Sequence, residues 1–233
     1  MTTLRVRLSL DLSYAQAARR AQYLLRLEPH GAEAVSLSIE PFSHTQDRRL
    51  DRRGFGACYV ALDAPHDRVM FSAEAEVQPA APLSPPELAW EDIRREIGTP
   101  ASPEALEAAA CLAPVGDGGA GERLFRPGET LRQGVGRLPR GVTPALAALR
   151  AAGLAAVAVS GIAFPDGAGP EHRYWLAIFA GQGRWCEWDS ERGLSPGPRL
   201  RLGLGRSLED VAPVRAVAVG AGDMTATFRV ARA

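Results

Sequence analysis

The sequence contains no lysine, and all 27 of its basic residues are arginine. This absence excludes Schiff-base chemistry, a phosphate-loop lysine and an internal amine acceptor. The 27 basic residues are balanced by 27 acidic ones, so the chain lacks the broad basic field that attracts nucleic acid. All-arginine usage can reflect anion binding or the base composition of the genome, and we favour the second explanation.

Long apolar runs and closely spaced cysteines are also missing. No apolar run approaches the roughly 20 residues of a membrane helix, and the first residues, "MTTLRVRLSLDLSY", alternate where a signal peptide would be continuously apolar. We therefore expect a cytoplasmic protein without membrane contact. The three cysteines, Cys58, Cys111 and Cys186, are too far apart for a disulfide framework or a zinc signature. We expect neither a metal ion nor a cofactor.

Residues 1–80 are predicted to form an antiparallel β-sandwich. In "LRVRLSLDLSY", apolar and polar residues alternate, as in a strand with one buried face. Short runs of similar character follow at regular spacing: "YLLRLEP", "AVSLSIEPF", "GFGACYVALD" and "HDRVMFSAEAEV". Several short strands separated by turn residues are typical of a sandwich.

A proline-rich stretch, "QPAAPLSPPE" at residues 78–87, predicts a boundary between two domains. Residues 88–233 then contain helical patterns at "PPELAWEDIRREI", "SPEALEAAACLAP" and "TPALAALRAAG". In the last of these, Thr143 is the expected N-cap and Gly153 the expected end. Strand patterns follow, so the second domain, and with it the fold class, is predicted to be α+β, with helices before an antiparallel sheet.

The segment "EHRYWLAIFAGQGRWCEWDS", residues 171–190, predicts a hairpin. An alternating strand precedes the turn "GQG", and a return strand ends at Asp189. A hairpin can place a histidine at the start of one strand beside an aspartate at the end of the other. His172 and Asp189 are thus candidates for a pair that serves a nucleophile.

Four segments together resemble the bacterial transglutaminase-like proteins of the papain-like cysteine-enzyme superfamily. They are "GFGACYVALDAPHDRVMFSAEAEV", "ALRAAGLAAVAVSGIAF", "WLAIFAGQGRWCEWDS" and "GRSLEDVAPVRAV". The resemblance implies an N-terminal β-sandwich and a reduced papain-like domain. It also implies acyl transfer or amide hydrolysis by a Cys, a His and an Asp, with the cysteine at the N-terminus of a helix.

The family's catalytic positions are only partly kept in this sequence. The nucleophile's position falls at or near Leu138, and the family's histidine position, two residues before Trp175, holds Arg173. His172 is one residue away, which in a strand turns its side chain to the opposite face. Asp189 alone keeps its place. If the site is inactive, we expect Asp189 to bond with backbone N–H groups or to pair with an arginine such as Arg173.

A rearranged site could use Cys111 or Cys186 with His172 and Asp189. Cys111 lies near the end of an alanine-rich helical pattern, where the helix dipole disfavours a thiolate. Cys186 lies on a predicted strand between two bulky residues, so packing is the simpler explanation for both thiols. His172 could reach Asp189 only through a β-bulge.

Our first hypothesis is therefore a catalytically inactive transglutaminase-like protein that acts as a binding or scaffolding subunit. Proteins of this family often accompany a circularly permuted ATP-grasp ligase and a helical companion protein, so the resemblance implies such a partner in peptide modification. The alternative is an active cysteine amide hydrolase or acyltransferase with the rearranged site. A third hypothesis is anion or nucleotide binding by the arginine-rich segment at residues 48–53.

Overall fold

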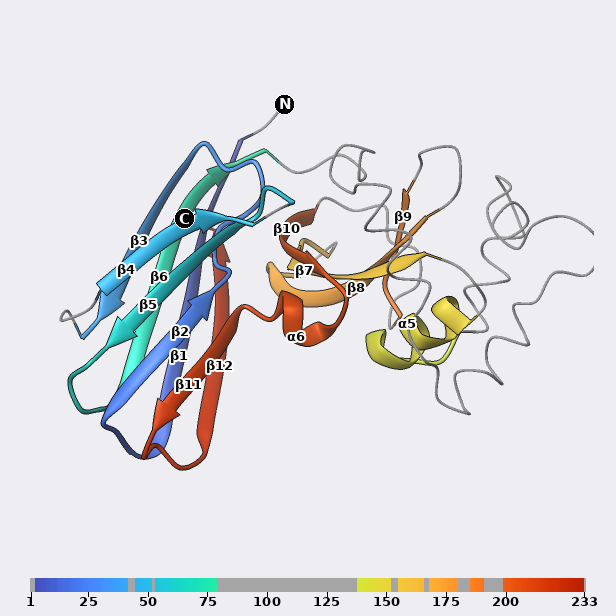
Figure 1. Ribbon diagram of the computed structural model, residues 1–233. Helices are drawn as coiled ribbons and strands as arrows, with labels where there is room; N and C mark the ends of the chain where they lie inside the picture. Colours follow the sequence, from blue (N-terminus) through green and yellow to red (C-terminus); the bar gives the residue numbers. More distant parts are fainter. Residues whose placement is uncertain are drawn as a thin grey trace, which may run out of the picture.

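The computed structural model describes residues 3–41, 45–51, 53–78, 138–151, 155–165, 168–179, 185–190 and 199–232. Within these ranges the chain forms three four-stranded antiparallel sheets and two helices. Two of the sheets face each other as a sandwich, and the third sheet lies beside one end of it (Figure 1). Neither described helix has the length and apolar character needed to span a lipid bilayer.

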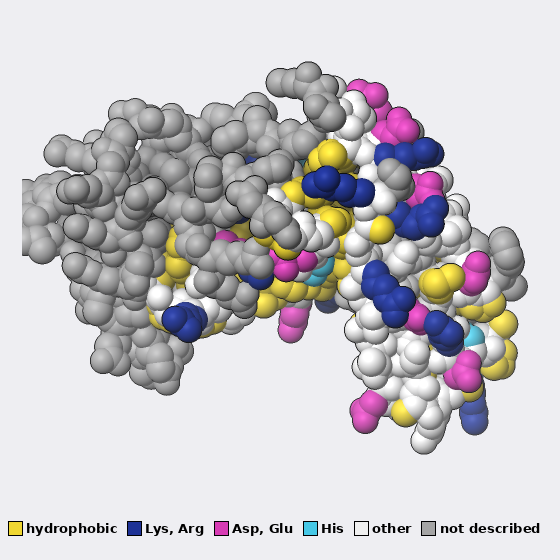
Figure 2. Space-filling view, turned by 180° about the vertical axis from the view of Figure 1, so that it is seen from behind, with side chains coloured by type: hydrophobic (Ala, Val, Ile, Leu, Met, Phe, Trp, Pro, Cys, Tyr) yellow, Lys and Arg dark blue, Asp and Glu magenta, His cyan; other side chains and the backbone are white. Residues whose placement is uncertain are grey.

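The first sheet of the sandwich has the strand order β12-β1-β6-β3. Its strands are β12 (Met224–Arg232), β1 (Leu4–Ala18), β6 (His66–Val77) and β3 (Ala34–Glu40). The alternation predicted for β1 is confirmed, because its apolar residues from Val6 to Leu12 are at most 2% exposed. On the outer face, arginines and acids pair across the strands, as in Arg7 with Glu74 and Arg68 with Asp11. Figure 2 shows such basic and acidic side chains close together over the sandwich.

The second sheet has the strand order β11-β2-β5-β4. Its strands are β11 (Val214–Val219), β2 (Arg20–Leu25), β5 (Gly56–Leu62) and β4 (Thr45–Leu50). All six residues of β4 are exposed, and β4 is last in the order of its sheet. The apolar inner faces of the two sheets form one core, whose largest fully buried side chains include Tyr23 and Phe71.

The two ends of the chain meet in the sandwich. β12 pairs with β1 from Val6↔Arg232 to Tyr14↔Met224, and β11 pairs with β2. The last strands of the chain therefore complete the sheets that the first strands begin. The predicted boundary at residues 78–87 stays a prediction, because residues 79–137 lie outside the described part of the chain.

The third sheet has the order β10-β7-β8-β9. Its strands are β10 (Arg199–Gly205), β7 (Ala156–Ala163), β8 (Glu171–Phe179) and β9 (Trp185–Trp188). β8 and β9 pair antiparallel from Leu176↔Trp188 to Phe179↔Trp185, which confirms the predicted hairpin. The short helix α6 (Leu208–Val211) follows β10 and is capped by Ser207, whose hydroxyl accepts a hydrogen bond from the backbone N–H of Asp210.

Helix α5 (Val142–Ala151) covers one face of this sheet and confirms the helix predicted there. It begins one residue before the expected cap Thr143, after Gly141 with a φ of 96°. Its buried side chains, among them Leu146 and Leu149, pack against alternate residues of β7 and β8. Apolar residues at helical spacing opposite apolar residues at strand spacing thus form a second core.

The predicted α+β class is wrong, because the described chain is mostly β. Segments of the second half that carry a period of two, such as "RLRLGLG", "VRAVAV" and "MTATFRVAR", pair as strands β10, β11 and β12. Only one segment with a helical period, α5, forms a helix of more than one turn within the described residues. The helices predicted within residues 85–97 and 102–114 lie outside the described part.

The sandwich and the third sheet are joined by the turn that follows β4. Phe55 is fully buried against Val157, Val159 and Trp175 of the third sheet. The Asp51 carboxylate accepts hydrogen bonds from the backbone N–H groups of Arg53 and Phe55, which holds this turn in shape. We call residues 51–55 the docking turn, of which Arg52 is not described. The turn thus places an aromatic ring from the sandwich in a core of the third sheet, and this contact joins the sandwich to the third sheet.

Candidate functional site

The hairpin places Arg173 of β8 beside Asp189, the residue that follows β9. One terminal guanidinium nitrogen of Arg173, Nη1, donates a hydrogen bond of 3.1 Å to Oδ2 of Asp189, and Nε donates one of 2.8 Å to Oε1 of Glu171. The Asp189 side chain is 7% exposed and the Arg173 side chain 17%. The expected pairing of Asp189 with an arginine such as Arg173 is therefore confirmed.

Burial and pairing act in opposite directions on the Arg173 guanidinium. Burial by itself would lower the pKa of Arg173, but the hydrogen bonds to Glu171 and Asp189 outweigh it, so the pKa is raised. Arg173 therefore stays protonated at any physiological pH and cannot serve as a general base. The position two residues before Trp175 therefore holds a permanent cation.

A second group of charges lies on the same face of the third sheet. The carboxylate of Glu187 in β9 accepts hydrogen bonds from Nε of Arg201 at 2.8 Å and from the indole N–H of Trp175 at 3.1 Å. Arg199 lies 3.9 Å from the same carboxylate, with its guanidinium over the Trp175 ring at 5.1 Å. Burial lowers the pKa of Arg199, against the opposing effects of Glu187 and Asp189.

Six buried or half-buried charged side chains thus form one layer, which we call the hairpin charge layer: Glu171, Arg173, Glu187, Asp189, Arg199 and Arg201. Three are basic and three acidic, so the layer is neutral. Sequence reasoning found Arg173 and Asp189 but missed the other four. The alternation of arginine and leucine in "RLRL" of β10 was the signal, because it places two arginines on one face of a strand.

His172 lies on the opposite face of the sheet from Arg173. β7 and β8 pair in continuous register, with Ile162 opposite His172 and Gly161 opposite Arg173. The His172 ring nitrogen Nε2 is 2.9 Å from the hydroxyl of Ser160, and its ring packs against Tyr174 and against Phe228 of β12. No bulge carries His172 across to Asp189, and burial lowers its pKa to about 4. The imidazole is therefore neutral and held within the protein.

The candidate nucleophile positions do not supply a thiol among the described side chains. Leu138, to which the resemblance assigns the nucleophile's position, is 7% exposed and packs in the core beneath α5. Cys111 lies outside the described residues, and Cys186 lies in β9 with a side chain that the structure does not describe. The one described free thiol, Cys58, is in the sandwich, where burial raises its pKa. Across the described ranges, no three metal-binding side chains come together.

The described arginines of the arginine-rich segment each have a partner within the protein. Arg48 binds Glu28, Arg49 binds Asp47, and Arg53 donates to the backbone carbonyl of Leu204. These contacts use the guanidinium groups to brace β4 and the docking turn.

Comparison with known proteins yields a fold and no family. No family model matches the chain, and a search of curated proteins finds no match. Among solved structures, the chain is similar to a proposed cysteine protease from Cytophaga hutchinsonii, with a TM-score of 0.65 and 14% identity, over 100% of this chain and 91% of that one. The chain therefore shares the fold of that protein, which agrees with the resemblance to papain-like cysteine enzymes as far as the fold is concerned.

Proposed function

We propose that this protein is a non-catalytic relative of the transglutaminase-like enzymes that binds a protein or peptide partner. The observation that carries the proposal is the ion pair between Arg173 and Asp189, at the place where the family has a histidine and an aspartate. A guanidinium cannot take a proton from a nucleophile. The carboxylate that would orient a histidine is occupied by a cation instead.

The neighbouring residues support the same proposal. His172, the only histidine in the hairpin, bonds with Ser160 on the other face and is neutral. A site that used it would have to reverse the side-chain order of β8, because neighbouring residues in a strand point to opposite faces. The active alternative, an amide hydrolase or acyltransferase built on Cys111 or Cys186, would need that rearrangement.

The partner that we propose is the ATP-grasp ligase, together with the helical companion protein, that accompanies such proteins in bacteria. This part of the proposal rests on the family resemblance and on the shared fold. The complex would bring a peptide substrate to the ligase, and the present chain would contribute binding surface and no chemistry. Co-purification of the tagged protein with the ligase from its host tests this association.

The proposal is tested by turnover. The full-length protein is incubated with glutaminyl peptides and an amine acceptor, and release of ammonia and formation of conjugate are measured with and without iodoacetamide. We expect no turnover above the uncatalysed rate, in the wild type and in Arg173→His. Turnover that iodoacetamide abolishes and that Asp189→Asn reduces would refute the non-catalytic role.

A further inference from the structure

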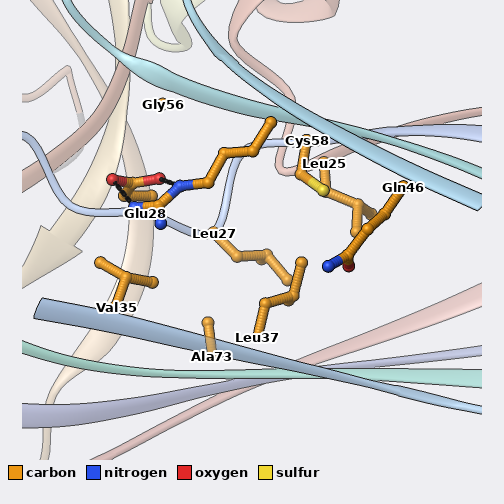
Figure 3. Close-up of a pocket in the computed structure, with 10 residues that line it drawn as sticks. Leu25, Leu27, Glu28, Val35, Leu37, Gln46, Gly56, Cys58 and Ala73 are labelled. Atoms are coloured by element: carbon orange, nitrogen blue, oxygen red, sulfur yellow. Dashed lines mark hydrogen bonds and ion pairs between the residues drawn. The ribbon is translucent and has the colours of Figure 1, made fainter.

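The sandwich contains a pocket between its two sheets, at the edge where β3 and β4 lie. The pocket has a volume of about 150 Å³, and an apolar cavity of about this size can take up a molecule such as benzene. Leu25, Leu27, Val35, Leu37 and Ala73 provide its apolar lining, and Cys58 adds a thiol (Figure 3).

The pocket exists because β4 presents polar side chains where a sandwich strand normally presents apolar ones. The register places Gln46 opposite Val60 and Arg48 opposite Cys58, both buried residues on the inner face of β5. Gln46 and Arg48 are nevertheless exposed. Val35 and Leu37 on the facing strand β3 are only half-buried and line the pocket together with Gln46 and Arg48.

A fixed ion pair stands at the mouth of this apolar pocket. Arg48 donates to Glu28 through Nε, at 2.8 Å, and through Nη2. The Glu28 side chain is 19% exposed and the Arg48 side chain 52%. Gly56 leaves room for the carboxylate, because a Cβ at this position would lie 2.4 Å from Oε2 of Glu28. The carboxylate is thus held at one place on the rim.

The ion pair still has hydrogen-bonding capacity. Nη1 of Arg48 has no partner among the described residues, and each Glu28 oxygen, which accepts one bond from Arg48, has a second lone pair. A ligand's carboxylate can therefore bond to Nη1 while its ammonium group bonds to Glu28. The rim carries one positive and one negative charge, so a zwitterion matches it without adding net charge to the site.

We propose that this pocket binds a small zwitterion with an apolar side chain, of which a free aliphatic α-amino acid such as leucine is the simplest example. The ammonium group binds Glu28, the carboxylate binds Arg48, and the side chain enters the pocket among Leu25, Leu37 and Ala73. This site is separate from the hairpin charge layer, and the proposal does not depend on whether the hairpin is catalytic.

The test is a calorimetric titration of the full-length protein with three ligands. Leucine carries both head groups, 4-methylpentanoate lacks the ammonium group, and 3-methylbutylamine lacks the carboxylate. On the wild-type protein, leucine should bind saturably and about tenfold more tightly than either analogue, because each analogue loses a charge-assisted hydrogen bond. Absence of saturable leucine binding, or equal binding of the three ligands, would overturn the proposal.

Two variants separate the head groups. Glu28→Gln should weaken leucine about tenfold but should not weaken 4-methylpentanoate, and Arg48→Gln should weaken leucine but should not weaken 3-methylbutylamine. Arg20→Gln is the matched control, because Arg20 forms an exposed ion pair with Asp63 elsewhere. Variants that bind leucine as well as this control does would contradict the assignment. If the pocket instead accepts an aliphatic side chain of a partner protein, free leucine will not saturate it, which also counts against the proposal.

Discussion

At the scale of single residues, one position decides what the hairpin can do. Arg173 holds Asp189 in an ion pair that is largely buried. A histidine at this place could act as a base, whereas the guanidinium has no accessible neutral form. The pair joins the two strands of the hairpin, so its removal should affect stability first.

Asp189→Asn should lower the free energy of unfolding by about 1–3 kcal/mol, since it leaves the Arg173 guanidinium buried with a weaker partner. The measurement is urea denaturation followed by circular dichroism. Asp63→Asn is the matched control, because its ion pair with Arg20 is exposed at both side chains. It should cost no more than about 1 kcal/mol. Equal effects of the two substitutions would show that the hairpin pair is not stabilising.

His172 gives the protein a pH dependence with a definite sign. Burial lowers its pKa from 6.5 to about 4, so between these values the unfolded chain binds a proton that the folded protein does not. Stability is therefore full above about pH 6.5 and falls as the pH decreases towards 4.

Relative to His172→Gln, the wild type should lose about 1–3 kcal/mol over this pH interval. Urea denaturation of both proteins at several pH values measures the difference. The comparison with the variant cancels the contribution of other titrating groups. Stability curves that run parallel from neutral pH down to pH 4 would mean that His172 titrates normally in the folded protein.

At the scale of elements, the docking turn at residues 51–55 is the feature that sequence reasoning interpreted least well. The arginines around it suggested anion or nucleotide binding. The structure instead buries Phe55 among residues of β7, β8 and β10. The phenylalanine lies outside any periodic run, so its burial depends on the approach of a sheet more than 100 residues later in the chain, which a local pattern cannot show.

Phe55→Ala should lower the free energy of unfolding by about 3–5 kcal/mol, because it removes a fully buried ring from the contact between sandwich and third sheet. Thermal and urea denaturation both report this loss. Leu50→Ala, at a side chain that is 70% exposed, is the control and should change stability by less than about 0.5 kcal/mol. A Phe55 variant as stable as the control would contradict the docking role.

At the same scale, strands with strict alternation could be predicted and charged ones could not. β1, β6, helix α5 and the hairpin of β8 and β9 follow from their periodicity. β4, "TQDRRL", and β10, "RLRLGLG", were missed because of their charged residues. In β10 the arginines occupy buried positions, and in β4 Arg48 stands opposite a buried residue of β5. Those exceptions line the pocket and the hairpin charge layer, so the local patterns fail where the candidate sites lie.

At the scale of the whole molecule, strands from the two halves of the sequence pair with each other. The sequence indicated a sandwich at residues 1–80 followed by a second domain, but β11 and β12 from the C-terminal end pair with β2 and β1. Strand pairing between the ends of a chain leaves no local signature, because the residue pattern of a strand does not depend on which strand pairs with it. In the sequence, the third sheet therefore lies between the two segments that form the sandwich.

Proteolysis at the proline-rich stretch, residues 78–87, should therefore give two fragments that stay together. Under native conditions they should co-elute on gel filtration, because the pairing of β1 with β12 by itself extends from Val6 to Tyr14. In denaturant they should separate. Fragments that separate without denaturant would contradict the strand pairing between the chain ends.

The central claim, that the proposed site has neither an activated thiol nor a base, is tested most directly by thiol labelling. Native and urea-unfolded protein are treated with iodoacetamide at neutral pH, and labelling of Cys58, Cys111 and Cys186 is followed by peptide mass mapping. We predict that no thiol reacts faster in the native protein than in the unfolded chain, where each has an ordinary pKa. A native Cys111 or Cys186 that reacts faster than its unfolded counterpart, and slows on Asp189→Asn, would show an activated thiolate and contradict the account.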